Sequence, residues 1–181
     1  MLIITNGHHK FILGPAAQEA YRRNRLAAFI TAGYPKGFMR KIIGFLANIG
    51  LKRFGRLLAR DEGIPDELVN ALWLSEVCIQ LGVLFRIFLG TAKYSAIIDD
   101  WGLRLYALQA ASVVRKTDAD FYHYRSGYGH RSVIIARSKG MQVVCDHSIA
   151  HPAVLQYLVE NRGQLPPFGV SGRSIYFGNT L

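Results

Sequence analysis

Residues 120–161 read DFYHYRSGYGHRSVIIARSKGMQVVCDHSIAHPAVLQYLVEN, and this stretch determines the predicted fold class. Residues 120–126 are short and aromatic-rich, and residues 141–145 are short and apolar, so both are predicted strands. Residues 130–139 and 152–161 carry helical patterns. The order strand, helix, strand, helix predicts parallel strands joined by a right-handed crossover.

The same alternation is predicted at the N-terminus. Residues 1–5 and 26–31 are strand candidates, with a helix candidate over 16–25 between them. Residues 91–116 predict a long helix that packs on the sheet. Together these patterns predict an α/β fold, a Rossmann-like three-layer sandwich with a mostly parallel sheet.

Composition narrows the class of partner. The 181 residues suit one domain, and a content of 50% hydrophobic and 19% charged residues argues against wholesale disorder. The formal charge of +10 suits anionic partners such as nucleic acid, acidic lipids or phosphorylated substrates. Cys78 and Cys145 have apolar neighbours, which predicts buried, reduced thiols in an intracellular protein.

Two segments bear on membranes. Residues 71–90 are long enough to span a bilayer, but Glu76 and Arg86 interrupt them, so we expect buried globular structure. Residues 38–60 are basic and amphipathic, with glycines that weaken a single helix. Their apolar face either packs in the core or lies on an anionic membrane surface.

The histidines gather near the ends of predicted strands, where parallel sheets bind ligands. Three of them, His123, His147 and His151, can be read as metal ligands together with Asp146. The histidines can also be read as structural hydrogen-bonding groups or as the lining of a polar substrate cleft. The His147–His151 pair falls in a loop ahead of Pro152, so no metal site is expected. The full set is His8, His9, His123, His130, His147 and His151.

Familiar nucleotide-binding and hydrolase motifs are missing from the sequence. The nearest approach to a dinucleotide fingerprint, Gly127-Tyr128-Gly129, has Ser132 in place of the third glycine. The chain contains no P-loop and no G-x-S-x-G nucleophile elbow. The 127–129 loop can still present backbone N–H groups to an anion.

Residues 120–160 resemble the second half of the N-terminal domain of GT-B glycosyltransferases, in particular retaining enzymes of family 4. The resemblance lies in an A-x-x-x-G helix end at residues 136–140 and a D-x-x-x-x-H-P turn at residues 146–152. The basic segment 38–60 and the sequence IPDELV at residues 64–69 also resemble that half of the family.

This resemblance implies an enzyme of two Rossmann-like domains facing a cleft. Residues 1–163 match the acceptor-binding domain, and residues 164–181 match a linker or the start of an otherwise missing donor-binding domain. The co-substrate is a nucleotide-sugar, with no further cofactor and no metal. The implied catalytic residue is His147, and a Gly-Gly pair of the family is replaced here by Gly7 and two histidines. The implied substrate-binding residues are Asn6, Gly7, His8, His9, His123, Arg125, Ser126, Gly127 and His151.

The expected partners are a nucleotide-sugar, held by the missing domain, and a sugar or lipid-linked acceptor. The expected location is cytoplasmic, with an anionic membrane surface as a further expected partner. One alternative is a non-catalytic subunit of a split transferase. Another is a basic α/β nucleic-acid-binding module, but the arginines are spread along the chain without a known motif, so no nucleic acid is expected.

Overall fold

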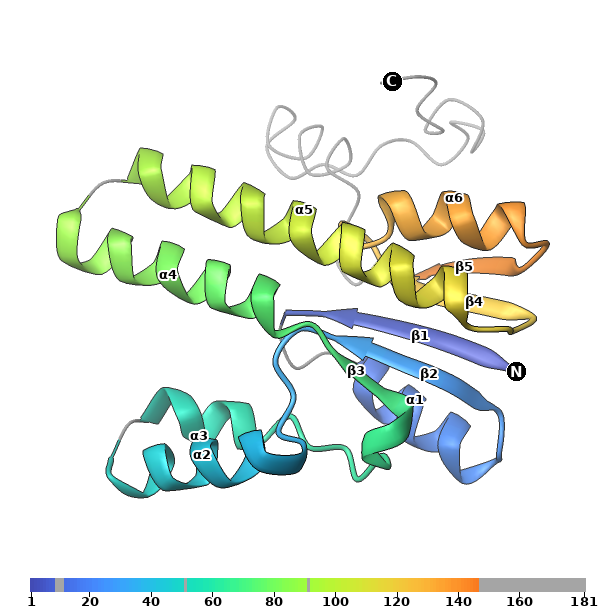
Figure 1. The fold of residues 1–181 in the computed structure, drawn as a ribbon, viewed down its shortest axis with the longest axis horizontal. Coiled ribbons are helices and arrows are strands. Elements are labelled where there is room, and N and C mark those ends of the chain that lie inside the picture. The colour runs from blue at the N-terminus through green and yellow to red at the C-terminus, as the bar shows by residue number, and fades with distance from the viewer. Residues whose placement is uncertain (9–11, 51, 91, 147–181) are drawn as a thin grey trace, which may run out of the picture. The chain divides into compact units, whose positions relative to one another are not determined.

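The computed structural model describes residues 1–146, apart from residues 9–11, 51 and 91 (Figure 1). Met1–Asp146 form one compact unit. Residues 147–181 lie outside the described residues, as do the predicted helix over 152–161 and the domain boundary expected at residue 163.

A five-stranded parallel sheet confirms the predicted α/β fold. The strand order is β3-β2-β1-β4-β5. Strand β1 is therefore central, with β2 and β3 added on one side of it and β4 and β5 on the other. The strands are β1 (Leu2–Gly7), β2 (Leu26–Thr31), β3 (Val69–Ala71), β4 (Phe121–Arg125) and β5 (Gln142–Asp146).

Six α-helices and a short 3-10 turn connect the described strands. The basic segment 38–60 is divided into two helices, and Gly50 lies between them with a φ of +93°, a conformation that suits glycine. The helices are α1 (Leu13–Arg22), α2 (Gly37–Asn48), α3 (Lys52–Leu58), α4 (Trp73–Leu89), α5 (Ala92–Lys116) and α6 (His130–Ser138), and the turn is Asp66–Leu68.

The core forms two layers, one on each face of the sheet. Ile3 and Ile4 are both fully buried, and because successive strand residues point to opposite faces, they belong to different layers. Ile3 packs in the layer that α5 and α6 cover, which contains Tyr106. Ile4 packs in the layer that α1 covers, which contains Ala17. This arrangement is the predicted three-layer sandwich.

Helices α4 and α5 form a hairpin that extends beyond the carboxyl ends of the strands (Figure 1). The two helices approach closely because Gly82 lies against Asp99 and Gly102 lies against Ile79. Large apolar side chains on the outside of the hairpin are exposed, among them Phe88 at 79%. The expectation that residues 71–90 are buried is therefore wrong for this face, because the sheet does not reach far enough to cover it.

The two cysteines are free thiols, but both are partly exposed rather than buried. Cys78 lies on α4 of the projecting hairpin, and Cys145 lies on β5 at the edge of the described sheet. The hydrophobic core therefore does not enclose either thiol. Within the described part of the chain, no helix is long and apolar enough to cross a bilayer.

Candidate functional site

The strand order reverses between β1 and β4, and this reversal defines the candidate site. The chain leaves β1 toward α1 on one face of the sheet and leaves β4 toward α6 on the other face. The loops after the two strands therefore diverge. In open α/β sheets, ligands bind beyond the carboxyl ends of the strands at such a point.

Three aromatic rings meet beside the end of β1. The His8 side chain is only 2% exposed, and its ring centroid lies 5.1 Å from that of Tyr106 and 5.5 Å from that of Tyr128. The two tyrosine rings are 5.3 Å apart. Burial raises the pKa of Tyr128, against the effect of a backbone hydrogen bond from His8, so this phenol stays protonated at neutral pH.

Gly7 has no room for a side chain. Its φ is +85°, and a Cβ at this position would lie 2.7 Å from the Tyr128 ring. The Gly7 N–H donates a hydrogen bond of 3.1 Å to the Tyr106 hydroxyl, which donates one of 3.3 Å to the Ile30 carbonyl. Tyr106 thus fixes the end of β1 against α5, and the glycine lets the loop after β4 approach.

Strand β4 ends with a buried guanidinium. Arg125 is 8% exposed and lies opposite Asp146 of β5. Burial lowers the pKa of Arg125, and electrostatic interactions with Tyr128 and Asp146 oppose this effect, so the side chain remains cationic at neutral pH. The Ser126 N–H donates to the Asp146 carbonyl at 2.9 Å, and Gly127 follows with a φ of +88°.

Asn6 is also buried, near the end of β1. The predicted residues Asn6, Gly7, His8, Arg125, Ser126 and Gly127 therefore all lie at the carboxyl ends of β1 and β4 or in the residues directly after them.

The two other histidines of the described residues, His123 and His130, are not gathered with His8. His123 pairs with Ile4 inside the sheet, two residues before the end of β4, and is half-buried. Burial lowers its pKa, against the opposing charge of Asp146. His130 is the exposed first residue of α6. The predicted site residues His9, His147 and His151 lie outside the described residues.

A buried ion pair at the same edge was not among the predicted site residues. Arg60 contacts both carboxylate oxygens of Glu76, at 2.9 and 3.3 Å. Arg60 and Glu76 also form hydrogen bonds with Gly33, in the loop after β2. Arg60 donates to the Gly33 carbonyl, and the Gly33 N–H donates to the Glu76 carboxylate. Burial would raise the pKa of Glu76, but the hydrogen bonds and charge of Arg60 outweigh it, so this pKa is lowered.

The charges of Glu76 and Arg60 also act on Tyr128, so the pair belongs to the surroundings of the site. The signal in the sequence was Glu76 itself, a carboxylate that interrupts an apolar run. Such a residue is rarely buried without a partner.

No group of three or more histidine, cysteine, aspartate or glutamate side chains that could hold a metal ion occurs within the described ranges. The binding capacity of this edge lies instead in imidazole, guanidinium, amide and phenol groups. These groups suit a ligand rich in hydroxyl or phosphate oxygens.

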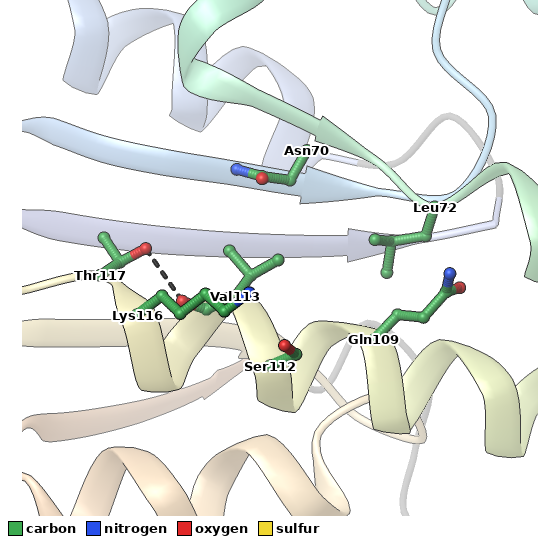
Figure 2. Close-up of a pocket in the computed structure, with 7 residues that line it drawn as sticks. All are labelled: Asn70, Leu72, Gln109, Ser112, Val113, Lys116 and Thr117. Carbon is green, nitrogen blue, oxygen red and sulfur yellow. Dashed lines mark hydrogen bonds between the residues drawn. The ribbon is translucent and has the colours of Figure 1, made fainter.

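A cavity of about 340 Å³ lies elsewhere, between the sheet edge at β3 and the C-terminal part of α5. Figure 2 shows Asn70 and Leu72 on one side of it and Gln109, Ser112 and Lys116 on the other. None of the candidate site residues that the structure describes lines this cavity. It is therefore distinct from the edge between β1 and β4.

The structure is that of a Rossmann-like α/β protein with buried polar side chains where its strand order reverses. No family model matches the chain, and neither a curated protein nor a solved structure matches it.

Proposed function

We propose that this chain is the acceptor-side domain of a GT-B glycosyltransferase. The enzyme moves a sugar from a nucleotide-sugar to an acceptor and retains the anomeric configuration. The observation that carries the proposal is the grouping of His8, Arg125 and Tyr128 at the carboxyl edge where the strand order reverses. Imidazole and guanidinium groups bond sugar hydroxyls or phosphates, and a neighbouring aromatic ring packs against the apolar face of a sugar.

Each group at this edge has a role in the proposal. His8 and Asn6 orient acceptor hydroxyls, and the buried positive charge of Arg125 favours an acceptor that carries phosphate. Ser126 and Gly127 present the backbone of the loop after β4. His123 lies further from the edge, so it acts on substrate through its neighbours.

The proposed catalytic residue is His147, with His9 and His151 as further substrate contacts; all three lie outside the described residues. The nucleotide-sugar, the proposed co-substrate, is held by a second domain. Transfer then draws on positioning and electrostatic stabilisation from both sides of a cleft. The proposed location is the cytoplasm, at a membrane surface that carries a sugar or lipid-linked acceptor.

Label transfer tests this function. The chain is assayed alone and fused after Leu181 to the donor-binding domain of a GT-B enzyme, with radiolabelled nucleotide-sugars and an acceptor extract. We expect the fusion to transfer label from one donor. His8→Ala and Arg125→Met each lower kcat/KM at least about tenfold.

The matched control is Asn70→Ala in the cavity of Figure 2, which leaves the rate unchanged. Circular dichroism checks that all three variants fold. Transfer that survives both edge variants, or a panel of donors that yields none, contradicts the proposal.

A further inference from the structure

Helix α2 carries an apolar stripe on its outer side. The stripe contains Phe38, Ile42 and Phe45 and continues to Ile49, the residue directly after the helix. The intervals of four, three and four residues place these side chains on one face. Phe38 is 74% exposed, Phe45 65% and Ile49 58%. The inward contact of α2 is made by Ile43, which is buried.

All charged residues in the segment around this stripe are basic. Residues 36–60 contain seven basic residues and no acidic one. Some of the basic side chains are engaged within the fold: Arg40 pairs with Asp61, and Arg60 with Glu76. The basic residues are Lys36, Arg40, Lys41, Lys52, Arg53, Arg56 and Arg60.

Lys41 and Arg56 are exposed, and neither forms an ion pair with a carboxylate in the described part of the structure. Lys41 lies next to Ile42 of the stripe, and Arg56 lies on α3, the neighbour of α2. Exposed phenylalanines flanked by unneutralised cations are the composition of helices that lie in the interface of an anionic bilayer.

Other occupants fit this surface less well. A second copy of the chain would bring the same cationic segment against itself, and like charges oppose association. Nucleic acid would use the cations but would leave the apolar stripe without a partner. Figure 1 shows α2 and α3 as a separate hairpin away from the sheet, which leaves them accessible to a flat surface.

We infer that α2 docks this protein on an anionic lipid bilayer, with Phe38, Phe45 and Ile49 in the interface and Lys41 and Arg56 at the headgroups. The inference gives a surface to the location named under the proposed function and rests on that part of it alone. Vesicle binding is measured without sugar transfer, so either proposal can fail while the other stands.

The test is co-sedimentation of the full chain with phosphatidylcholine vesicles, with and without phosphatidylglycerol. We expect binding to the anionic vesicles at least about tenfold stronger than to the neutral ones, and weaker at high salt. Phe38→Ser combined with Phe45→Ser lowers this binding at least about tenfold. The matched control, Phe85→Ser with Phe88→Ser on α4, removes the same number of exposed phenylalanines and keeps it.

A second pair of double variants separates the contribution of Lys41 and Arg56 to vesicle binding from the effect of net charge alone. Lys41→Glu with Arg56→Glu abolishes the preference for anionic vesicles. Arg131→Glu with Arg137→Glu on α6 makes the same change in net charge and preserves the preference. Equal binding to both vesicle types, loss of binding in the α4 pair but not the α2 pair, or self-association without vesicle binding would each overturn the inference.

Discussion

Gly7 and Gly129, beside the carboxyl ends of β1 and β4, cannot carry a side chain, and the physical reason differs between them. Gly7 has a left-handed backbone and also lacks space beside Tyr128. Gly129 has an ordinary φ of −108°, but a Cβ there would overlap the ring of Tyr124. The first position is constrained by its backbone and its neighbour, and the second by its neighbour alone.

Double-mutant cycles separate these reasons. Gly129→Ala should destabilise the protein, but in a Tyr124→Ala background its cost should fall close to zero, because the overlap is gone. Gly7→Ala should still cost about 1–2 kcal/mol in a Tyr128→Ala background, because the left-handed strain remains. Urea unfolding measures both cycles.

The control is Gly44→Ala on α2, where nothing lies within 4 Å of the added Cβ. It should raise the free energy of unfolding by about 0.5–1 kcal/mol through helix propensity. A Gly7→Ala cost that disappeared together with Tyr128 would contradict the assignment of strain.

His123 should make stability depend on pH near neutrality. Its pKa in the folded protein is below the value of 6.5 expected in the unfolded chain, chiefly because of burial. The unfolded state therefore binds more protons, so the contribution of neutral His123 is complete above pH 6.5 and is lost as the pH falls below it. Urea unfolding at several pH values should show a steeper loss for the native protein than for His123→Gln; equal slopes would rule the linkage out.

At the scale of elements, the Arg60–Glu76 pair ties the end of α3 and the loop after β2 to the first turn of α4. Glu76→Gln should destabilise the protein by roughly 3 kcal/mol, because Arg60 loses its counter-charge in a buried setting. Replacing both residues by methionine should cost less than the sum of the single replacements. Thermal unfolding of the single and double variants tests this, and strictly additive costs would show that the two side chains are not coupled.

The sequence predicted the elements whose patterns are local. Strands β1, β2, β4 and β5 and helix α6 have short apolar runs or clear helical spacing, and all were expected close to their observed bounds. Strand β3 was missed because it has only three residues and exists through its pairing with β2. The exposed face of α4 was missed because burial depends on what the fold places beside a helix, not on the helix itself.

The same distinction between local patterns and long-range contacts applies to the residues of the candidate site. His8 was predicted because it follows a predicted strand end, which a sequence pattern reveals, whereas Arg125 was named only through the resemblance of residues 120–160. Tyr106 was missed because its hydrogen bond with Gly7 joins residues 99 positions apart. The Arg60–Glu76 pair was missed for a similar reason, although a carboxylate in an apolar run hinted at a buried partner.

At the scale of the described unit, the candidate site and the helical hairpins α2–α3 and α4–α5 all lie at the carboxyl-end edge of the sheet. Figure 1 shows α2–α3 and α4–α5 extending beyond the carboxyl ends of the strands, and His8 and Arg125 mark those ends. A bilayer bound by α2 would therefore lie on the side where the acceptor is proposed to bind. This arrangement suits an acceptor that is itself held in the membrane.

We claim that the edge between β1 and β4 binds a saccharide acceptor. An amide-resolved NMR titration of the chain with a panel of saccharides and sugar phosphates measures this binding without any transfer reaction. We predict that at least one compound shifts the amide signals of Gly7, His8, Ser126 and Gly127, and that Arg125→Met weakens this binding. If no compound moves those signals, or if the shifts fall instead on Asn70 and Lys116 around the cavity of Figure 2, the claim is wrong.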